Sequence, residues 1–498
     1  MAKVLLIYPP WYTLLGMQCR EVPLSLCYLS AVLKKAGHET AIYNADVSDE
    51  QPQGRKRDIN LEAFKNYQAS LYDVGGRFWQ EIGETMASQK PDIVGIHMKT
   101  ASFKSVINLA TLVKQHNPKV PVIVGGPHPS MLPEDVLKQR AFDYAVLHEG
   151  ELSMVELVDT LAAGRTPGPD LKGIAYRGSD GKVVRTPPRE AIKDLDALPL
   201  PDRDALLYKE QYVPDSYGIS FTSRGCPFEC VYCDSPAFWG RKVRYRSPGS
   251  VVAELSEVHA KYGTRYVKFY DDTWTLNQKR GIEICEALLK AGLPGKGVTW
   301  QCTTRADCLS DDLVKAMKAS GCAMVNIGLE SASERILKVV KKGETKEEIE
   351  GGIRILQKHA IPINLYVMMG LPTETEAEVE ETMAFARSLN PNSLIPSIAT
   401  PYPGTELFKM AQQDGFIQSD LDWAEFFHQS PKMGLSKEIS PERFLDLKDR
   451  FLKVSDSYNG WSLKKGMVRR GSVLLLRDPR TFARKLVRKM LPASGATV

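Results

Sequence analysis

The sequence predicts an α/β protein with two successive domains of parallel strands, followed by a mainly helical region. Short apolar or β-branched runs alternate with amphipathic helical stretches twice along the chain, and a stretch rich in Pro, Gly and Asp separates the two series. Parallel neighbours need a crossover connection, so this alternation favours parallel sheets. We expect a doubly wound sheet in residues 1–165, a linker in 166–215, a partial, TIM-like (β/α)6 barrel in 216–415 and a C-terminal region in 416–498.

Five strands and four helices are expected in the first domain. The strands are VLLIY (4–8), TAIYN (40–44), DIVGIH (92–97), VPVIVGG (120–126) and YAVLHE (144–149). Helical patterns lie near 24–36, 78–89, 102–115 and 151–163, and the polar segment 46–76 is expected to be an excursion across the sheet edge. Ligands of doubly wound sheets bind beyond the carboxyl ends of the strands, so the loops after these strands are candidate binding loops.

Six strands are expected in the second domain, each followed by a helical stretch. They are ISFTS (219–223), YVKFYDD (266–272), GVTWQC (297–302), AMVNIGLE (323–330), INLYVMMG (363–370) and SLIPSIA (393–399). Barrels of this kind carry their chemistry at the carboxyl ends of the strands. The turn-rich linker is expected to form a hairpin at Ile174–Val184.

Composition excludes several classes of protein. Hydrophobic residues make up 43% and charged residues 25% of the 498 residues, which argues against long disorder. The net charge of +5 is too small for nucleic acid to be the main partner. The start MAKVLLIYPPW lacks a secretory signal, and no apolar run reaches the ~18 residues that span a bilayer, so we expect a cytoplasmic protein. Six scattered cysteines do not suggest a disulfide framework: Cys19, Cys27, Cys285, Cys302, Cys308 and Cys322.

The other three cysteines are clustered directly after the first strand of the second domain. Cys226, Cys230 and Cys233 lie in the run SRGCPFECVYCDSP with C-x3-C-x2-C spacing. Soft thiolate ligands on one short loop are suited to an iron-sulfur cluster, and three ligands leave one iron open. The alternatives are three buried cysteines or a zinc site, although structural zinc usually takes four protein ligands.

This run resembles the signature of the radical S-adenosylmethionine superfamily, C-x3-C-x-aromatic-C, with Tyr232 at the aromatic position. The resemblance implies a [4Fe-4S] cluster on the three cysteines. Its open iron would chelate the amino and carboxylate groups of S-adenosylmethionine, which is cleaved to a 5'-deoxyadenosyl radical. Tyr232 would then lie near the adenine.

Polar residues at the ends of later strands match the same family in order. Asp271 and Asp272 end the second strand of the barrel, Arg305 follows the third, and Glu330 ends the fourth. Such groups can hydrogen-bond the ammonium, carboxylate and ribose of the cofactor, although each of them could instead be a solvated loop charge. GLP (370–372) and PYPGTE (401–406) resemble later loops of cobalamin-dependent members and either approach S-adenosylmethionine or make turns.

Two loops of the first domain are candidates for a large ligand. GGPHPSMLPED contains Gly125, Gly126 and His128, and HEGE contains Glu149 and Gly150. Glycines let a backbone approach a ligand closely, but on this pattern alone many nucleotides would fit. Together with the cysteine motif, these loops resemble the cobalamin-binding radical S-adenosylmethionine enzymes over about residues 1–415, which implies a Rossmann- or flavodoxin-like cobalamin-binding domain.

The first loop, YPPWYTLLGM, departs from other cobalamin domains because it lacks the D-x-H-x-x-G that supplies an axial histidine. We therefore expect a base-off cobalamin without a histidine ligand, and we assign His128 to a turn or a phosphate-side contact. A bare fold that has lost cobalamin is the alternative.

The C-terminal region carries two features. Trp423, Phe426 and Phe427 could cap the barrel mouth or pack against its open edge. The stretch 461–490 mixes Lys and Arg with apolar residues, as an interfacial amphipathic segment or a solvated helix would. The first interpretation implies association with the inner face of the membrane and favours a lipid-like substrate.

These features predict a cobalamin-dependent enzyme that methylates an unactivated carbon or phosphorus centre of a small molecule or lipid. It would use two molecules of S-adenosylmethionine and an external one-electron donor such as flavodoxin or ferredoxin. The rivals are an oxidative cyclase or another tetrapyrrole- or lipid-modifying enzyme without methyl transfer, and a non-catalytic cofactor or redox sensor. No loop carries a pattern that identifies the substrate.

Overall fold

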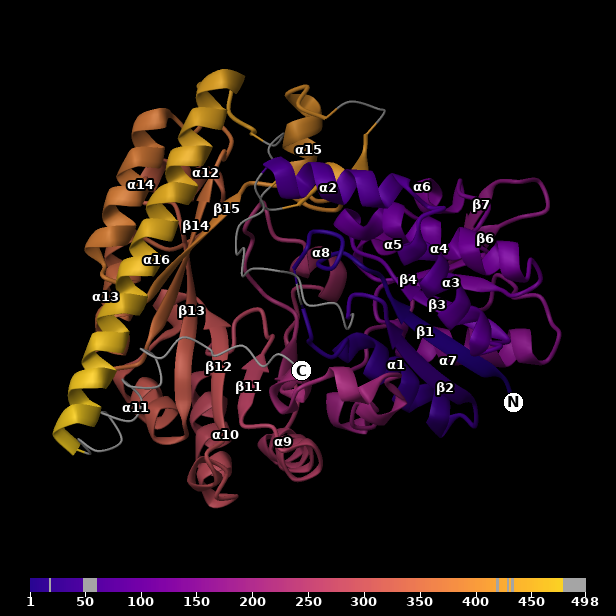
Figure 1. Cartoon of the computed structure of the whole chain (residues 1–498), viewed down its shortest axis with the longest axis horizontal. Coiled ribbons are helices and arrows are strands. Elements are labelled where there is room, and N and C mark those ends of the chain that lie inside the picture. Colours follow the sequence, from indigo (N-terminus) through magenta and orange to yellow (C-terminus); the bar gives the residue numbers. More distant parts are fainter. Residues whose placement is uncertain (18, 48–60, 418–420, 428–429, 431–433, 478–498) are drawn as a thin grey trace, which may run out of the picture.

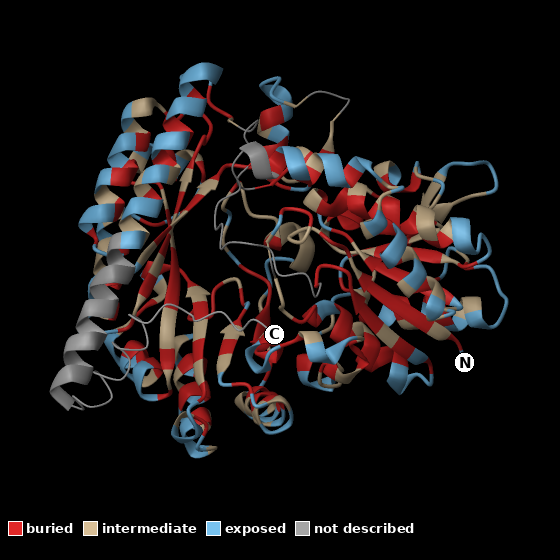
Figure 2. Ribbon diagram, viewed as in Figure 1, coloured by how far each residue is buried: buried red, intermediate tan, exposed pale blue. Residues whose placement is uncertain are grey.

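The structure is a computed structural model that describes residues 1–17, 19–47, 61–417, 421–427, 430 and 434–477. The side chains of residues 61–63 and 461–477 are not described. Two sheets lie side by side, each covered by helices (Figure 1). Their strands are mostly buried, whereas the outer faces of the helices are exposed (Figure 2).

The N-terminal sheet has the strand order β2-β1-β3-β4-β5-β6-β7. Its first five members are parallel and confirm the five predicted strands; they are β1 (Lys3–Tyr8), β2 (Glu39–Asn44), β3 (Ile93–His97), β4 (Val122–Gly125) and β5 (Tyr144–Val146). The predicted hairpin is also present, as β6 (Ile174–Arg177) and β7 (Val183–Arg185), and it extends this sheet in antiparallel fashion from β5. Part of the expected linker therefore belongs to the first sheet.

Helices cover both faces of this sheet, as the alternation of side chains along a strand requires. From β1, Leu5 and Ile7 pack into the core formed with α3 (Arg77–Ser88) and α4 (Phe103–His116). Val4 and Leu6 point to the other face, which α1 (Leu24–Lys35) and α7 (Gly150–Ala162) cover. The described part of the polar excursion contains α2 (Leu61–Tyr72).

The second sheet contains the six predicted strands, all parallel, in the order β15-β14-β13-β12-β11-β8. They are β8 (Ile219–Ser220), β11 (Tyr266–Phe269), β12 (Thr299–Thr304), β13 (Cys322–Glu330), β14 (Ile363–Met369) and β15 (Ser393–Ile398). The outer face is covered by α9 (Pro248–Tyr262), α10 (Gln278–Lys290), α11 (Asp311–Ala319), α13 (Lys346–Lys358) and α14 (Glu376–Ser388). No pairing joins β8 to β15 among the described residues, so the barrel is partial.

Several short elements complete the described chain. They are α5 (Pro127–Met131), α6 (Pro133–Leu137), β9 (Ser223–Arg224), α8 (Ser235–Trp239), β10 (Arg244–Tyr245), α12 (Glu334–Val339) and α15 (Glu406–Gln413). The long helix α16 (Pro441–Arg477) packs against β15 and α14. No helix in the described ranges is long and apolar enough to cross a membrane.

The C-terminal aromatic residues lie where neither expectation placed them. Trp423, Phe426 and Phe427 are buried in the core of the N-terminal domain, where Phe427 packs on Phe64 and Trp11. The indole of Trp423 donates a hydrogen bond to Asp135 at 2.9 Å. Burial of three large rings is worth several kcal/mol, so this segment ties the end of the barrel to the first domain.

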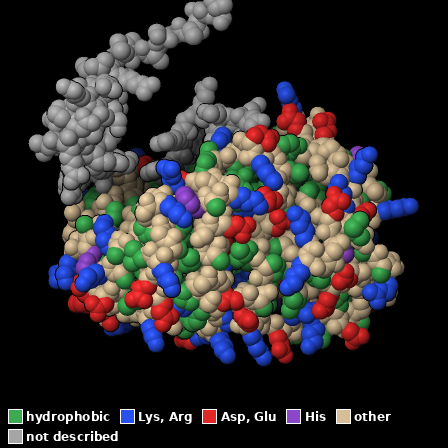
Figure 3. Space-filling view, turned by 90° about the horizontal axis from the view of Figure 1, so that it is seen from below, with side chains coloured by type: hydrophobic (Ala, Val, Ile, Leu, Met, Phe, Trp, Pro, Cys, Tyr) green, Lys and Arg blue, Asp and Glu red, His purple; other side chains and the backbone are tan. Residues whose placement is uncertain are grey.

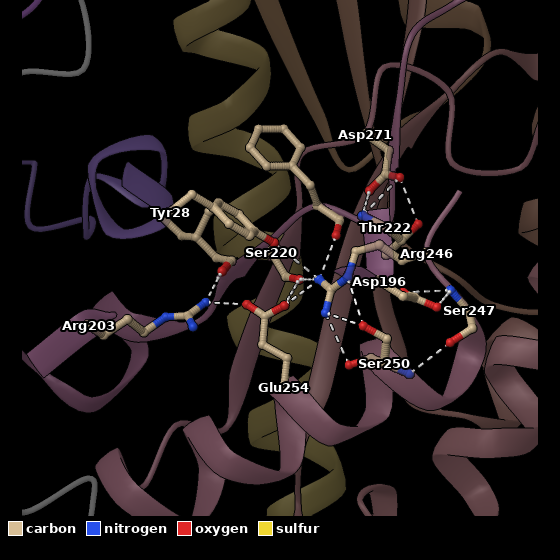
Figure 4. A network of polar contacts seen from close by, with 12 residues as sticks. Tyr28, Asp196, Arg203, Ser220, Thr222, Arg246, Ser247, Ser250, Glu254 and Asp271 are labelled. Carbon is tan, nitrogen blue, oxygen red and sulfur yellow. Dashed lines mark hydrogen bonds and ion pairs between the residues drawn. The ribbon is translucent and has the colours of Figure 1, made fainter. Parts of the chain in front are cut away.

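The surface carries no dominant charged region on the face shown in Figure 3, where Lys and Arg are interspersed with Asp and Glu. One network of buried charges lies at the junction of the domains (Figure 4). Glu254 of α9 is 1% exposed and forms ion pairs with Arg203 of the linker and with Arg246. Arg246 also donates to Tyr28 of α1 at 3.4 Å. This single carboxylate therefore joins the linker, the barrel and the first domain.

Replacement of Glu254 by Ala is expected to lower the free energy of unfolding by about 3 to 5 kcal/mol, because it leaves two buried guanidinium groups uncompensated. Chemical denaturation followed by tryptophan fluorescence measures the change. The control is Glu350→Ala, which removes an exposed pair with Arg354 and should cost about 0.3 to 0.5 kcal/mol. Equal losses in the two variants would contradict the structural role of Glu254.

Candidate active site

A cavity of about 470 Å³ lies between the carboxyl edge of the N-terminal sheet and the mouth of the barrel. We call it the interdomain cavity. Its lining from the first domain includes Tyr8, His97, Lys99, Gly125, Gly126, Glu149 and Gly150. Its lining from the second domain includes Phe221, Arg224, Asp234, Ser235, Trp239, Tyr270 and Asp272. The loops predicted to bind cobalamin and the residues that flank the cysteine motif, Arg224 and Asp234, thus line one space.

The cavity continues as an apolar slot between the first sheet and helices α1 and α7. Leu6, Gly95 and Ile123 line it from the sheet, and Met154 lines it from α7. A Cβ atom on Gly95 would lie 2.9 Å from Leu6 Cδ2 and 3.1 Å from Met154 Cε, so the wall has no room for a side chain at this position. A deep apolar slot that opens at the strand ends fits the heterocyclic base of a base-off cobalamin.

Glycines form the mouth of this slot. Gly126 has a φ of +119°, and a Cβ there would lie only 2.6 Å from the carbonyl oxygen of Met98. Only glycine tolerates this conformation and this contact. The backbone of Gly125, Gly126 and Gly150 therefore reaches the cavity without side chains, which suits close approach by a large ring.

His128 lies away from the cavity. Its side chain is buried, with Nδ1 3.2 Å from the Thr100 hydroxyl and the ring between Phe103 and Trp423. Burial lowers the pKa of His128 to about 4, so the imidazole is neutral. His128 belongs to the short helix α5, which begins at Pro127, and it is not among the residues that line the cavity. The expectation of a phosphate-side contact is therefore not supported by its position.

Glu149 lines the cavity, but its carboxylate binds protein groups. It pairs with Arg224 at 3.5 Å and with Arg244, and it accepts a hydrogen bond from the Ile192 amide at 3.1 Å. Its neighbour Glu151 pairs with Arg224 at 2.6 Å. These buried pairs attach the start of α7 to the strands β9 and β10, which flank the cysteine loop.

The sequence analysis did not identify Arg224 or Glu151. Arg224 lies two positions before the first cysteine of the motif, and its guanidinium also packs over the rings of Tyr28 and Trp239. The acidic HEGE run and a basic residue beside the motif were visible, but their pairing depends on the contact between domains.

The three cysteines of the motif are free thiols on one loop. Cys226 is buried, with its sulfur 3.9 Å from the Thr273 hydroxyl, and the amide of Cys233 donates to the carbonyl of Cys230 at 3.1 Å. Burial raises the pKa of Cys226 and Cys233. In the described ranges no three His, Cys, Asp or Glu side chains converge on a single-ion site. A cubane cluster instead binds each thiolate at a different iron, so a spread of three thiols around one loop fits it.

The two adjacent acids after β11 have different surroundings. Asp271 is buried and accepts hydrogen bonds from the Thr222 amide at 3.0 Å, the Thr222 hydroxyl at 2.7 Å and the Ser223 hydroxyl. It therefore holds the start of the cysteine loop. Asp272 lines the cavity and accepts a hydrogen bond from Ser235 at 2.6 Å. Burial raises the pKa of Asp272 to about 6.

Arg305 supports the cysteine loop from below. Its guanidinium lies 3.7 Å from the ring centroid of Phe228 and donates to Asp307 at 3.0 and 2.7 Å. It also donates to the carbonyl oxygens of Lys342 and Gly343. Because these partners occupy the donors of Arg305, its role is to position the cysteine loop.

Glu330 and Tyr232 form a buried polar site beside Cys230. Glu330 has a φ of +64° and lies 3.6 Å from the ammonium of Lys342, which is 3.3 Å from Glu344. The Tyr232 hydroxyl is buried without a hydrogen-bond partner among the described residues. An unsatisfied buried hydroxyl next to a charge pair fits a polar ligand. The sequence analysis missed Lys342 and Glu344, although the run KKGE was a visible signal.

The two later loops make turns. Glu374 is fully buried after GLP and accepts hydrogen bonds from the amides of Gly370 and Leu371 at 2.7 and 3.2 Å. Burial raises the pKa of Glu374 to about 8. In PYPGTE, Gly404 has a φ of +88° and lies against Met131 of the first domain. Of the two alternatives for these loops, the contacts favour turns.

Comparison with known proteins agrees with this arrangement. The models of the radical SAM superfamily and of the B12 binding domain match residues 220–386 and 19–158. An uncharacterized methyltransferase of Pyrococcus horikoshii is 34% identical and aligns with 88% of this chain and 89% of its own. An anaerobic magnesium-protoporphyrin IX monomethyl ester cyclase of Rubrivivax gelatinosus is 33% identical over 66% of this chain and 60% of its own.

A solved structure shares the fold. TsrM, a radical S-adenosylmethionine methyltransferase of Kitasatospora setae, was solved with cobalamin and a [4Fe-4S] cluster bound. The match has a TM-score of 0.66 at 18% identity and covers 84% of this chain and 76% of TsrM. At this identity the likeness supports the arrangement of the two domains.

The apolar slot can be tested by Gly95→Val. To accommodate the new side chain, Leu6 or Met154 must move into the slot. Overpacking of this kind costs about 1 to 3 kcal/mol, so we expect cobalamin to bind about 10- to 100-fold more weakly. Absorbance titration with hydroxocobalamin measures the affinity, and iron and sulfide content should not change. The control is Gly83→Val on α3, where a Cβ lies 3.7 Å from Leu112. Wild-type affinity in Gly95→Val would exclude the slot as the binding site.

The slot, the glycine mouth and the residues that flank the cysteine loop line one cavity, and both family models match the parts of the chain that form them. The Pyrococcus relative extends the similarity over nearly the whole chain. The protein therefore belongs to the cobalamin-binding radical S-adenosylmethionine enzymes, whose cofactors are a [4Fe-4S] cluster, S-adenosylmethionine and cobalamin.

Proposed function

We propose that this enzyme methylates an unactivated carbon or phosphorus centre of a small molecule bound in the interdomain cavity. The observation that carries the proposal is the shared cavity, which is lined by the candidate corrinoid loops and by Arg224 and Asp234, the residues that flank the cysteine loop. A methyl donor on one side and a radical generator on the other can then act on one substrate. The name of the Pyrococcus relative, a methyltransferase, supports the same reaction class.

When bound, the cluster with S-adenosylmethionine supplies a 5'-deoxyadenosyl radical, and cobalamin supplies a methyl group. The residues of this chain would bind and orient the cofactors and the substrate, and they would shield them from water. We propose that Cys226, Cys230 and Cys233 hold the cluster, with their loop positioned by Asp271 and Arg305. Asp272 can accept a hydrogen bond from a ligand in the cavity. The buried hydroxyl of Tyr232, which does not line the cavity, can donate a hydrogen bond to a ligand beside the cysteine loop.

Aromatic side chains would protect the reaction from water. Phe221, Trp239 and Tyr270 line the barrel side of the cavity, and Tyr8 lines the opposite side. The wall is largely apolar and would limit access of water to the reacting groups. We further propose that a flavodoxin or ferredoxin supplies single electrons to the cluster.

The second candidate function is oxidative cyclisation without methyl transfer. It is favoured by the 33% identity to the Rubrivivax cyclase, although this chain spans 60% of the length of that protein. The two candidates differ in their use of S-adenosylmethionine: methylation consumes two molecules for each product and adds a labelled methyl group, whereas cyclisation adds none.

We predict that Cys226→Ala abolishes the iron-sulfur absorbance and electron paramagnetic resonance signal after anaerobic reconstitution, because one of three thiolate ligands is lost. Reductive cleavage of S-adenosylmethionine should fall to background, while hydroxocobalamin binding persists. The control is Cys308→Ala, which replaces a partly exposed free cysteine outside the loop and should keep the cluster. A cluster retained by Cys226→Ala would refute the assignment of this ligand.

Product analysis with S-adenosylmethionine carrying a labelled methyl group then tests the reaction. A labelled methyl group in the product, together with one 5'-deoxyadenosine and one S-adenosylhomocysteine for each product molecule, supports methylation. Cleavage of S-adenosylmethionine without label in any product favours the cyclase class. Absence of cleavage in the reconstituted wild type would favour a sensor and contradict both proposals.

We also propose that the enzyme works in the cytoplasm and that residues 461–498 contact the inner membrane face. The support is the basic and apolar composition of that stretch, whose side chains lie outside the described residues. Removal of 461–498 is expected to abolish co-sedimentation with vesicles containing anionic lipid, because each basic residue near such a surface contributes about 1 kcal/mol. Neutral vesicles are the control, and unchanged sedimentation of the truncated enzyme would refute the proposal.

A further inference from the structure

Lys99 is a cation in the interdomain cavity that has no carboxylate partner among the described residues. Strand β3 ends at His97, and Lys99 lies two residues further along the chain. The side chain of Lys99 lines the cavity. Its ammonium donates to the Tyr8 hydroxyl at 3.2 Å and lies 5.8 Å from the centroid of the Tyr8 ring. The other Lys or Arg in the described lining, Arg224, is paired with Glu151 and Glu149. Lys99 is therefore the cation available to a bound group.

The groups around Lys99 keep it charged. The neighbouring Tyr8 raises the pKa of Lys99, and the charge of Lys99 in turn opposes the rise that burial causes in the pKa of Asp234. His97 stacks on Tyr8 with ring centroids 5.3 Å apart, and burial lowers the pKa of His97 to about 3, so this imidazole is neutral. Tyr12, Cys19 and Asp234 also lie on the cavity wall. Burial raises the pKa of both Tyr12 and Cys19, so these two groups stay protonated at neutral pH.

The position of Lys99 relates it to the corrinoid. Gly95, in the wall of the apolar slot, belongs to β3 and precedes Lys99 by four residues. The base of a base-off cobalamin hangs from the lower side of the corrin ring, so a base in the slot puts that side over the mouth of the slot. Tyr8, His97 and Lys99 line this mouth.

We propose that Lys99 is a positioning residue that stabilises the reduced, cobalt(I) state of the bound corrinoid through its positive charge. The inference rests on the cofactor assignment above and goes beyond the proposed reaction. Addition of one electron to the cobalt(II) corrinoid lowers the charge of the metal centre by one. A cation near the ring would therefore lower the free energy of the reduced form relative to the oxidised form, and it would raise the midpoint potential.

The test is the midpoint potential of the cobalt(II)/cobalt(I) couple in the cobalamin-loaded protein, titrated with titanium(III) citrate and followed by absorbance. The titanium reagent supplies the electron, and no substrate or S-adenosylmethionine is needed. We expect Lys99→Met to lower the equilibrium constant for reduction at least tenfold, which is about 59 mV for one electron. Lys99→Arg keeps the charge and should stay near the wild-type potential.

Lys104→Met is the matched control. Lys104 also lies over a tyrosine ring, 5.4 Å from the centroid of Tyr72, but it does not line the cavity. Loss of its charge should leave the potential unchanged. Tyr8→Phe is a second variant: it removes the hydroxyl that holds the ammonium, keeps the aromatic ring, and should lower the potential by less than Lys99→Met does.

The outcomes separate this inference from the cofactor assignment. A lower potential in Lys99→Met, with Lys99→Arg and Lys104→Met unchanged, supports the inference. Corrinoid bound in Lys99→Met with an unchanged potential overturns it and would leave Lys99 to bind an anionic group of the substrate. If Lys99→Met fails to bind corrinoid, an unchanged potential in Tyr8→Phe overturns the inference. No corrinoid in the wild type would refute the cofactor assignment itself.

Discussion

The arrangement of the site depends on buried ion pairs between the two domains. Glu149 and Glu151 stand at the start of α7, whose first residue, Gly150, lines the cavity. Their partners Arg224 and Arg244 belong to the strands β9 and β10, and the first cysteine follows Arg224 by two residues. Removal of one member of such a set would leave a buried charge unpaired, so the pairs strongly oppose separation of the domains. The loop that carries the cysteines is thereby held close to Gly150, which lines the interdomain cavity.

A second group of contacts acts on the same junction from other directions. Glu254 joins the linker and the barrel through Arg203 and Arg246, and Trp423 packs into the core of the first domain from the C-terminal side of the barrel. Polar pairs supply orientation because their geometry is specific, whereas the aromatic segment supplies buried apolar area. A reaction that uses two cofactors needs this rigidity, since a change of about an ångström in their separation has large effects on transfer.

The polar residues that were predicted from the sequence to bind cofactors differ in their roles. Asp271, Arg305 and Glu149 use their charges on the protein, where they shape the cysteine loop or the domain contact. Asp272 and the buried hydroxyl of Tyr232 retain hydrogen-bonding capacity for a ligand. Position at the end of a strand predicts proximity to the site, but the available partners decide whether a side chain serves the scaffold or the ligand.

Local patterns were enough to predict the eleven parallel strands of the two sheets, the cysteine motif and the glycine loops, because each depends on periodicity or on spacing within one loop. Tertiary structure alone decided where the hairpin of the linker pairs, why His128 turns away from the cavity, and why the rings of Trp423 and Phe427 lie in the first domain. It also decided which charges are paired. Lys99 donates a hydrogen bond to Tyr8 but has no carboxylate partner among the described residues. These features arise from contacts between segments far apart in the chain, and no local pattern encodes such partners.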